Sequence, residues 1–408
     1  MRTIQEQPPP TRRRRSLRPV AAGLSLAAVF LAVIAIPLEA ASELNLTAAE
    51  TSAWIMMIYG LPSLLTILLI IRYRQPLLIT GNVFVLIFVL LLGGELTWPE
   101  LVGATMVAGG VVLVLALTGF TNRLAAFLPP PIVYGLLAGA VLGLLADMFT
   151  ALGTSTLLVG VTVGSYLLSR FFFGERVPAL LTSLVVGVSV AIIGQFTGPA
   201  PTPVWPAVTV TMPVFSIAAL LTAAPVLVVF ITLQANAPSV VYLRSQGYEP
   251  PEHVVSLVSG AGTMVASVMG PMGVSLSLPS TALTAGPHAG GLEIRHWGGY
   301  LAAAAGLLIA VISGFIAEML EFIPPPLLTA IVGLAVIGIL SQALQEMTKG
   351  PLLLGPLVAL GTSVSNLELL GLGRFFWALV LGIAVSLLAE REGWKRLREA
   401  RDGATVEA

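Results

Sequence analysis

The chain is dominated by apolar stretches, each close to the length that a helix needs to cross a membrane. Such a helix takes about 20 mostly apolar residues. Only 10% of the residues are charged, whereas about a quarter are charged in a soluble domain. The 14 stretches lie at 20–37, 51–71, 76–93, 101–119, 129–148, 155–173, 177–196, 215–235, 253–269, 274–287, 297–316, 324–344, 350–367 and 374–389. The sequence therefore predicts an all-α polytopic membrane protein.

The positions of lysine and arginine test this count, because cytoplasmic loops carry an excess of both. If the spans alternate from a cytoplasmic N-terminus, 19 of the 20 basic residues face the cytoplasm and only Arg374 lies near the outer face. We therefore expect a multi-pass protein of the cytoplasmic membrane with both termini inside, cytoplasmic tails over 1–18 and 390–408, and an extracytoplasmic loop over 197–214. Cleavage of segment 20–37 as a signal peptide is the alternative that its arginine-rich flank leaves open.

The composition excludes several classes of site. The chain has no cysteine and three histidines, none of them in an H-x-x-x-H spacing, so thiolate chemistry and the common zinc-hydrolase motif are absent. No ATP-binding glycine-rich loop occurs, so energy for transport would come from a gradient or a separate subunit. The net charge of zero gives no field that would recruit nucleic acid. We expect no metal and no cofactor.

Two stretches 195 residues apart resemble each other. Phe127–Leu145 and Phe322–Leu340 are identical at eight of 19 positions, including a triple proline. Apolar helices are often alike, but the shared prolines and the constant offset favour a true repeat. The offset covers seven segments, an odd number, so the two copies would cross the membrane in opposite directions, as in many secondary transporters. The predicted repeats cover residues 19–196 and 215–389.

Segments 76–93 and 274–287 occupy matching places in the two repeats and are the least regular of the series. Inverted-repeat transporters bind their solute where such matching helices are broken. We expect a short extended stretch before a half-helix in each, because extended backbone at membrane depth is tolerated only inside protein or beside a cavity. The backbone N–H groups at the half-helix starts, near Gly81 and Ser280, would then attract an anion.

Polar side chains on these two segments, and on the segment that begins at residue 215, are the candidate substrate ligands. Two amides interrupt that third segment and must face protein or a cavity, because an unpaired amide is costly in hydrocarbon. Hydroxyl groups can equally bond to their own helix or join helices. Pro238 should break or kink the helix close to the second amide. The candidates are Thr80, Gly81, Asn82, Gln234, Asn236, Ser275, Ser277, Ser280 and Thr281.

Two acidic residues are candidates for proton coupling. Asp147 lies near the end of segment 129–148, and Glu39 follows segment 20–37. Ionisable groups near membrane depth usually have a function. Solvated helix ends are the alternative explanation for both.

Three motifs resemble the BenE family of benzoate/proton symporters: "NAPSVVYLRSQGY" from Asn236, "YRQP" from Tyr73 and "GPHAGGLEIRHW" from Gly286. The resemblance covers roughly residues 50–390. It implies the seven-plus-seven fold shared with nucleobase and sulfate transporters, with a core domain of segments 1–4 and 8–11 and a gate domain of segments 5–7 and 12–14. It also implies uptake of an aromatic carboxylate with a proton. The family usually has Gln directly before Asn-Ala-Pro and Gly after it, whereas Ala235 and Ser239 stand there in this chain.

These observations predict a secondary transporter, and no enzyme, that imports an aromatic carboxylate such as benzoate together with a proton. Its partners would be a small organic anion, the proton and the lipid bilayer, and the sequence leaves open a homodimer. One alternative is a carrier of the same fold for a nucleobase, sulfate or bicarbonate. Another is a channel, although no motif that would form a selectivity filter is present.

Overall fold

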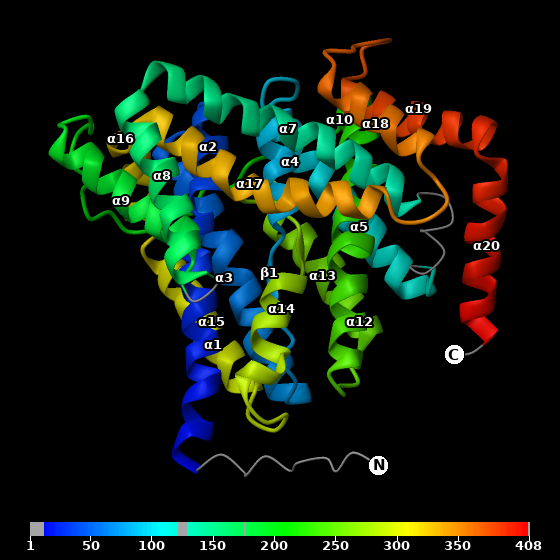
Figure 1. Cartoon of the computed structure of the whole chain (residues 1–408), viewed down its shortest axis with the longest axis horizontal. Coiled ribbons are helices and arrows are strands. Elements are labelled where there is room, and N and C mark those ends of the chain that lie inside the picture. Colours follow the sequence, from blue (N-terminus) through cyan, green and yellow to red (C-terminus); the bar gives the residue numbers. More distant parts are fainter. Residues whose placement is uncertain (1–11, 121–128, 175–176, 407–408) are drawn as a thin grey trace.

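The computed structural model describes residues 12–120, 129–174 and 177–406, and most of them are helical (Figure 1). Of the sequence predictions, residues 1–11 of the basic tail, Arg123, Arg176 and the first two residues of the repeat copy at Phe127 lie outside the described residues. The part up to residue 120 contains α1 (Arg12–Val33), α2 (Ala35–Glu43), α3 (Ala48–Tyr73), β1 (Ile79–Gly81), α4 (Val83–Leu92) and α5 (Trp98–Thr118).

The remaining elements follow in two groups along the chain. The middle of the chain contains α7 (Pro130–Thr154), α8 (Thr156–Phe173), α9 (Ala179–Ile193), α10 (Ile217–Thr222), α11 (Ala224–Val229), the π-helix η1 (Phe230–Asn236), α12 (Ala237–Ser245) and α13 (Glu252–Ser267). The last part contains β2 (Val274–Leu276), α14 (Leu278–Ala285), the 3-10 helix η2 (Pro287–Ala289), α15 (His296–Val311), α16 (Ser313–Phe322), α17 (Pro325–Met347), α18 (Leu354–Val364), α19 (Arg374–Ala389) and α20 (Arg391–Val406).

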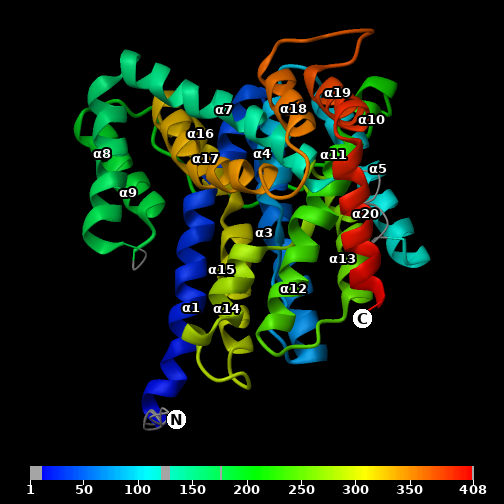
Figure 2. The ribbon, with the colours of Figure 1, turned by 45° about the vertical axis from the view of Figure 1, so that its right-hand side comes forward.

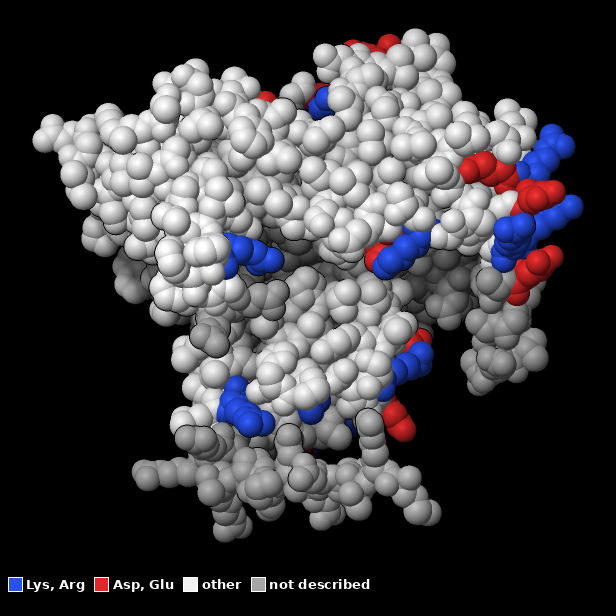
Figure 3. Space-filling model, in the orientation of Figure 1, with Lys and Arg blue, Asp and Glu red and all other residues white. Residues whose placement is uncertain are grey.

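Seven described helices are long and apolar enough to cross a membrane, and the bent pair α15–α16, with 64° between its parts, adds an eighth if it is one span. Four further apolar helices, α4, α9, α18 and α19, are shorter. Charged side chains are few over most of the face shown in Figure 3 and gather on α20. The chain is therefore a polytopic α-helical membrane protein, as the apolar segments predicted.

Two predicted segments end at the wrong residue. The first span runs from Leu17 to Glu43; it passes Pro37 because this proline lies in the first turn of α2, where no backbone hydrogen bond is lost. The segment expected to end at 235 continues to Ser245. The interruption expected near Pro238 is instead the π-helix η1, and this proline occupies the first turn of α12. Such π-helical turns are frequent at functional sites.

β1 and β2 form a two-stranded antiparallel ladder near the middle of the molecule. The register pairs Ile79 with Leu276, Thr80 with Ser275 and Gly81 with Val274. Each strand leads into a half-helix, α4 or α14, and the two strands stand 195 residues apart in the sequence. The helix-capping residues Asn82 and Ser277 have the same spacing.

Buried side chains satisfy the backbone groups that this short ladder leaves open, as burial in a membrane protein requires. The Thr66 hydroxyl accepts from the N–H of Ile79 at 2.9 Å and donates to its carbonyl at 3.0 Å. On the other strand, the N–H of Val274 donates to the Thr263 hydroxyl at 2.9 Å. The ladder is therefore held by α3 and α13 as well as by its own pairing.

The helices α7–α9, α17 and α18 pack differently from those around the ladder. α7 and α17 lie side by side and run across the direction of α1 and α12 (Figure 1). α8 and α9 form a pair at the edge of the molecule, packed on α17 (Figure 2). α7 approaches α18 so closely that Gly135 and Gly139 leave no room for a Cβ against Pro356 and Leu360, a use of small residues typical of membrane helices. The cavity described next lies where these helices meet the ladder.

Candidate functional site

A cavity of about 420 Å³ opens beside the ladder. Its walls come from β1 and α4, from β2 and α14, from η1, from α1 and α3, and from α9 and α17. Cavities that hold small molecules usually measure about 300–1,000 Å³ and are mostly apolar with a few polar groups. The volume and the lining therefore suit a small organic solute.

Seven of the nine candidate ligands line this cavity, and they come from three separate parts of the chain. The remaining two, Asn236 and Thr281, do not line it. The seven are Thr80, Gly81, Asn82, Gln234, Ser275, Ser277 and Ser280. The structure thus brings together the two irregular segments and the amide-bearing helix.

Asn82 is fully engaged by the protein. As the N-cap of α4, its Oδ1 accepts from the N–H groups of Phe84 and Val85 at 2.9 and 3.2 Å. Its Nδ2 donates to the carbonyl of Phe230 at 3.1 Å and to the Ser275 hydroxyl at 3.0 Å. The Asn82 amide therefore joins the start of α4 to η1 and β2. The first N–H groups of α4 that were expected to attract an anion are already occupied by this cap.

The start of α14 is capped by hydroxyl groups. The Ser277 hydroxyl accepts from the Ser280 hydroxyl at 3.0 Å and, more weakly, from the Ser280 N–H at 3.5 Å. The hydroxyl proton of Ser277 has no acceptor within the described part of the chain. It can therefore donate to a solute in the cavity, in place of the backbone N–H groups that the sequence suggested.

The two amides of the third segment have different surroundings. Gln234 is 5% exposed and lines the cavity, and its Oε1 has no hydrogen-bond partner among the described residues. The side chain of Asn236 donates to the Ser259 hydroxyl at 3.0 Å and accepts from the N–H of Leu276 at 2.8 Å. Because a buried polar group normally has a partner, Gln234 is the amide that a solute would meet: its Oε1 can accept from a donor such as a protonated acid, and its Nε2 can donate to a carboxylate.

An apolar and aromatic wall completes the cavity, and the sequence analysis did not identify it. Phe30 on α1, Tyr59 on α3 and Phe84 on α4 line it. Phe30 and Tyr59 meet edge to face with ring centroids 5.8 Å apart, and the Tyr59 hydroxyl donates to the Phe30 carbonyl at 3.1 Å. Their local sequence shows only apolar helices, so no motif marks them.

The two acidic candidates lie outside the cavity lining. Glu39 belongs to α2 and is 9% exposed; its Oε1 accepts from the Thr329 hydroxyl on α17 at 2.8 Å. The charges that act on Glu39 are the carboxylates of Glu43 and Asp147. Asp147 is exposed on α7, two turns before that helix ends at Thr154. In the described residues, no group of three His, Asp or Glu side chains could hold a metal ion.

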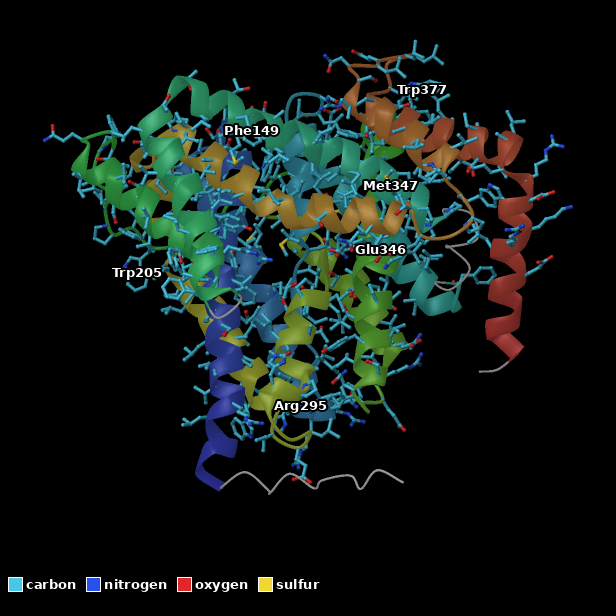
Figure 4. The ribbon with its side chains drawn as sticks, in the orientation of Figure 1. Phe149, Trp205, Arg295, Glu346, Met347 and Trp377 are labelled. Carbon is cyan, nitrogen blue, oxygen red and sulfur yellow. The ribbon has the colours of Figure 1, made fainter. Side chains whose placement is uncertain are left out.

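Arg295 holds the far end of the half-helix α14. It is 8% exposed, and its guanidinium donates to the carbonyls of Ala285 and Gly290 at 2.5 and 2.8 Å. Figure 4 shows it below α14, at the end away from β1. A cation at a helix C-terminus is favourable, so Arg295 fixes the half-helix whose other end faces the cavity.

Comparison with known proteins gives consistent matches along the chain. The family model described as "Benzoate membrane transport protein" (BenE) matches residues 15–388. The "Inner membrane protein YdcO" of Escherichia coli (strain K12) is 27% identical over 390 residues, which cover 90% of this chain and 97% of that protein. The "Benzoate membrane transport protein" of Acinetobacter baylyi is 24% identical over 360 residues, covering 85% and 88%.

Solved structures of anion transporters share the fold. The transmembrane domain of the cyanobacterial bicarbonate transporter BicA superposes with a TM-score of 0.55 at 16% identity, covering 92% of this chain and 98% of that one. The murine Solute Carrier 26 family member A9 in the inward-facing state superposes with a TM-score of 0.63 at 13% identity, covering 95% and 69%.

Proposed function

Because this chain belongs to the BenE family of membrane transport proteins, we propose that it imports an aromatic carboxylate such as benzoate together with a proton. It is a secondary transporter and a multi-pass protein of the inner membrane. The relative from Acinetobacter baylyi is named for benzoate, and this supports the choice of solute.

The observation that carries the proposal is that the cavity lining combines polar side chains with aromatic ones. The carboxylate would accept hydrogen bonds from the Ser277 hydroxyl, from the Gln234 Nε2 and from the Ser280 hydroxyl, whose proton would turn from the Ser277 oxygen to the solute on binding. The ring would lie against Phe30 and Phe84. Hydrogen bonds to a charged group contribute about 1.5–3 kcal/mol each. Among the described residues no lysine or arginine lines the cavity, so these neutral donors and the dipole of α14 would hold the charge.

The proposed topology is fourteen segments in two inverted repeats, with both termini in the cytoplasm. The long apolar helices, the four shorter ones and the 195-residue spacing of both strands and both caps support it. The core domain would comprise α1–α5 and α10–α16, and the gate domain α7–α9 and α17–α19. A single cysteine in the loop 197–214 should react with an impermeant reagent on intact cells; reaction only after permeabilisation would reject this orientation. Crosslinking in membranes would test the homodimer.

We further propose that Glu39 carries the coupled proton. It joins α2, in the core, to Thr329 of α17, in the gate. A buried carboxylate needs a partner of opposite charge, whereas its charged neighbours are the carboxylates of Glu43 and Asp147. In this proposal the proton is carried on Glu39 while the two domains are in contact, and separation of the domains admits water and releases it.

Substitution of Glu39 tests this role. We expect Glu39→Gln to uncouple uptake from the proton gradient while benzoate exchange across the membrane continues. Asp147→Asn tests the second acidic candidate. Because Asp147 is exposed on α7, we expect a smaller effect, limited to its influence on Glu39. Gradient-driven accumulation by Glu39→Gln at the wild-type level would reject the assignment.

Uptake of labelled benzoate into proteoliposomes with an imposed pH gradient tests the function itself. We expect accumulation that an uncoupler abolishes and that excess bicarbonate, sulfate or uracil does not compete. Accumulation of bicarbonate in place of benzoate would instead favour the same-fold alternative that BicA represents. Flux that only equilibrates the solute would favour a channel.

A further inference from the structure

One face of α17 forms part of the cavity wall. This helix comes from a different part of the chain from the two half-helices α4 and α14. Its lining residues are Ala335, Gly338, Ile339 and Gln342. Their spacing of three, one and three residues places them on a single side of the helix. This wall belongs to the proposed gate, whereas the serines and Gln234 belong to the proposed core.

Gly338 leaves unfilled space in this wall. A Cβ built at Gly338 has no atom within 4 Å. Gly333 on the same helix differs, because a Cβ there would collide with Met148. Gly333 therefore serves helix packing, whereas Gly338 leaves room inside the cavity for part of a solute.

Gln342 supplies a polar group on the same face, one turn beyond Gly338. Its side chain makes no hydrogen bond within the described part of the chain. The polar side chains next to it are engaged elsewhere: Gln345 donates to Ser341 at 3.4 Å, and Glu346 pairs with Lys349 at 2.5 Å. Glu346 is labelled in Figure 4, at the end of α17. The amide of Gln342 is thus free to meet a solute in the cavity.

We propose that this face of α17 selects among aromatic carboxylates by their ring substituents, and that the preferred substrates carry a hydroxyl group that bonds to Gln342. The space beside Gly338 accommodates the substituent, and the carboxylate stays with the serines and Gln234. The inference rests on the proposed transport of aromatic carboxylates. It adds that the solute has polar groups at both ends, each recognised by a different domain.

The first test replaces the amide by an apolar side chain of similar size. Purified wild type and Gln342→Leu are compared for binding of benzoate, 3-hydroxybenzoate and 4-hydroxybenzoate by calorimetry. We expect the wild type to bind at least one hydroxybenzoate more tightly than benzoate. Gln342→Leu should keep benzoate affinity within about twofold and weaken that hydroxybenzoate about tenfold, the effect of one lost hydrogen bond.

The second test fills the space beside Gly338. Gly338→Val should weaken both hydroxybenzoates at least about tenfold, because the added side chain would occupy the space proposed for the ring substituent, and should affect benzoate less. Gly143→Val is the matched control. Gly143 stands 195 residues earlier, a Cβ there would meet no atom within 4 Å, and the residue does not line the cavity. The control should bind all three acids as the wild type does.

The outcomes distinguish a failure of the proposed function from a failure of the proposed role of α17. A wild type that binds none of the three acids would overturn the proposed function, and this inference with it. A wild type that binds benzoate but shows no preference for a hydroxybenzoate, or a preference that Gln342→Leu retains, would overturn the role of α17 alone.

Discussion

The two half-helix starts, α4 and α14, face one cavity and stand at equivalent positions of the repeat, yet their chemistry differs. α4 reads VFVLIFVLLL, and the side-chain amide of its capping residue Asn82 makes all of its hydrogen bonds within the protein. α14 reads LPSTALTA and is capped by Ser277, whose hydroxyl proton remains available. The two starts therefore share their place behind a strand of the ladder but differ in chemistry. We propose that α4 serves as scaffold and aromatic wall and that α14 forms the polar end of the site.

The largest expected effect concerns the scaffold side. Asn82→Leu would leave two N–H groups of α4, the Phe230 carbonyl and the Ser275 hydroxyl without this partner. We expect a loss of about 3 kcal/mol in stability, since a lost cap and buried unsatisfied groups add together. Thermal unfolding in detergent measures it. A variant that is as stable as the wild type but has lost solute binding would show that Asn82 is a solute ligand and not a structural residue.

The polar side should behave in the opposite way. Ser280→Ala removes a hydroxyl that faces the cavity and should weaken benzoate binding about ten- to a hundredfold, the range for one hydrogen bond to a charged group. Its unfolding temperature should change little. Ser280→Pro removes both the hydroxyl and the backbone N–H. Comparison with Ser280→Ala, which removes only the hydroxyl, separates the two contributions. An effect of Ser280→Pro on affinity, with none from Ser280→Ala, would restore the backbone as the anion ligand.

The two amides within η1, Gln234 and Asn236, offer a second comparison between a solute ligand and a structural residue. Gln234→Leu should weaken benzoate binding about tenfold and leave stability unchanged or improved, because it removes a buried amide without a partner. Asn236→Leu should destabilise the fold instead, since Ser259 and the Leu276 N–H lose their bonds to it. Benzoate titrations and thermal melting curves of the two variants measure these effects on affinity and stability. Equal losses of affinity in both variants, at equal stability, would contradict the assignment.

The smallest effect concerns the start of α18, outside the cavity lining. Burial opposes the ionisation of Glu390, but hydrogen bonds from the backbone N–H groups of Leu353, Gly355 and Leu354 outweigh it and lower the pKa of this carboxyl. A lowered pKa in the folded state means that the stabilisation is present above the ordinary value of 4.5 and is lost as pH falls through the folded value. Glu390→Gln should therefore melt earlier than the wild type at pH 7 and equally at low pH. A difference that persists unchanged in acid would exclude the charged cap.

The sequence predicted the class of fold and the segments that line the cavity, because both follow from local pattern. The role of these segments in binding a solute stays a prediction. Length and hydropathy mark membrane helices, and the offset of 195 residues marks the matching segments that contain Asn82 and Ser277. Which of the two amides, Gln234 or Asn236, has a hydrogen-bond partner could not be predicted. Asn236 is satisfied by Ser259 and Leu276, which lie 23 and 40 residues away, and Gln234 has no such partner among the described residues.

Contacts between distant elements were equally hidden. Glu39 meets Thr329 across 290 residues, and Phe30 reaches the cavity only because α1 packs beside α14 and α15. An apolar helix in the sequence gives no indication of which of its residues face lipid and which face a solute. The aromatic wall and the face of α17 therefore required the three-dimensional arrangement.

The most direct test of the account is a structure of the protein with benzoate bound, determined by electron cryo-microscopy in a lipid nanodisc. We expect the carboxylate about 3 Å from the hydroxyls of Ser277 and Ser280, with the ring against Phe30 and Phe84. A carboxylate bound at the start of α4, or outside this cavity, would contradict it.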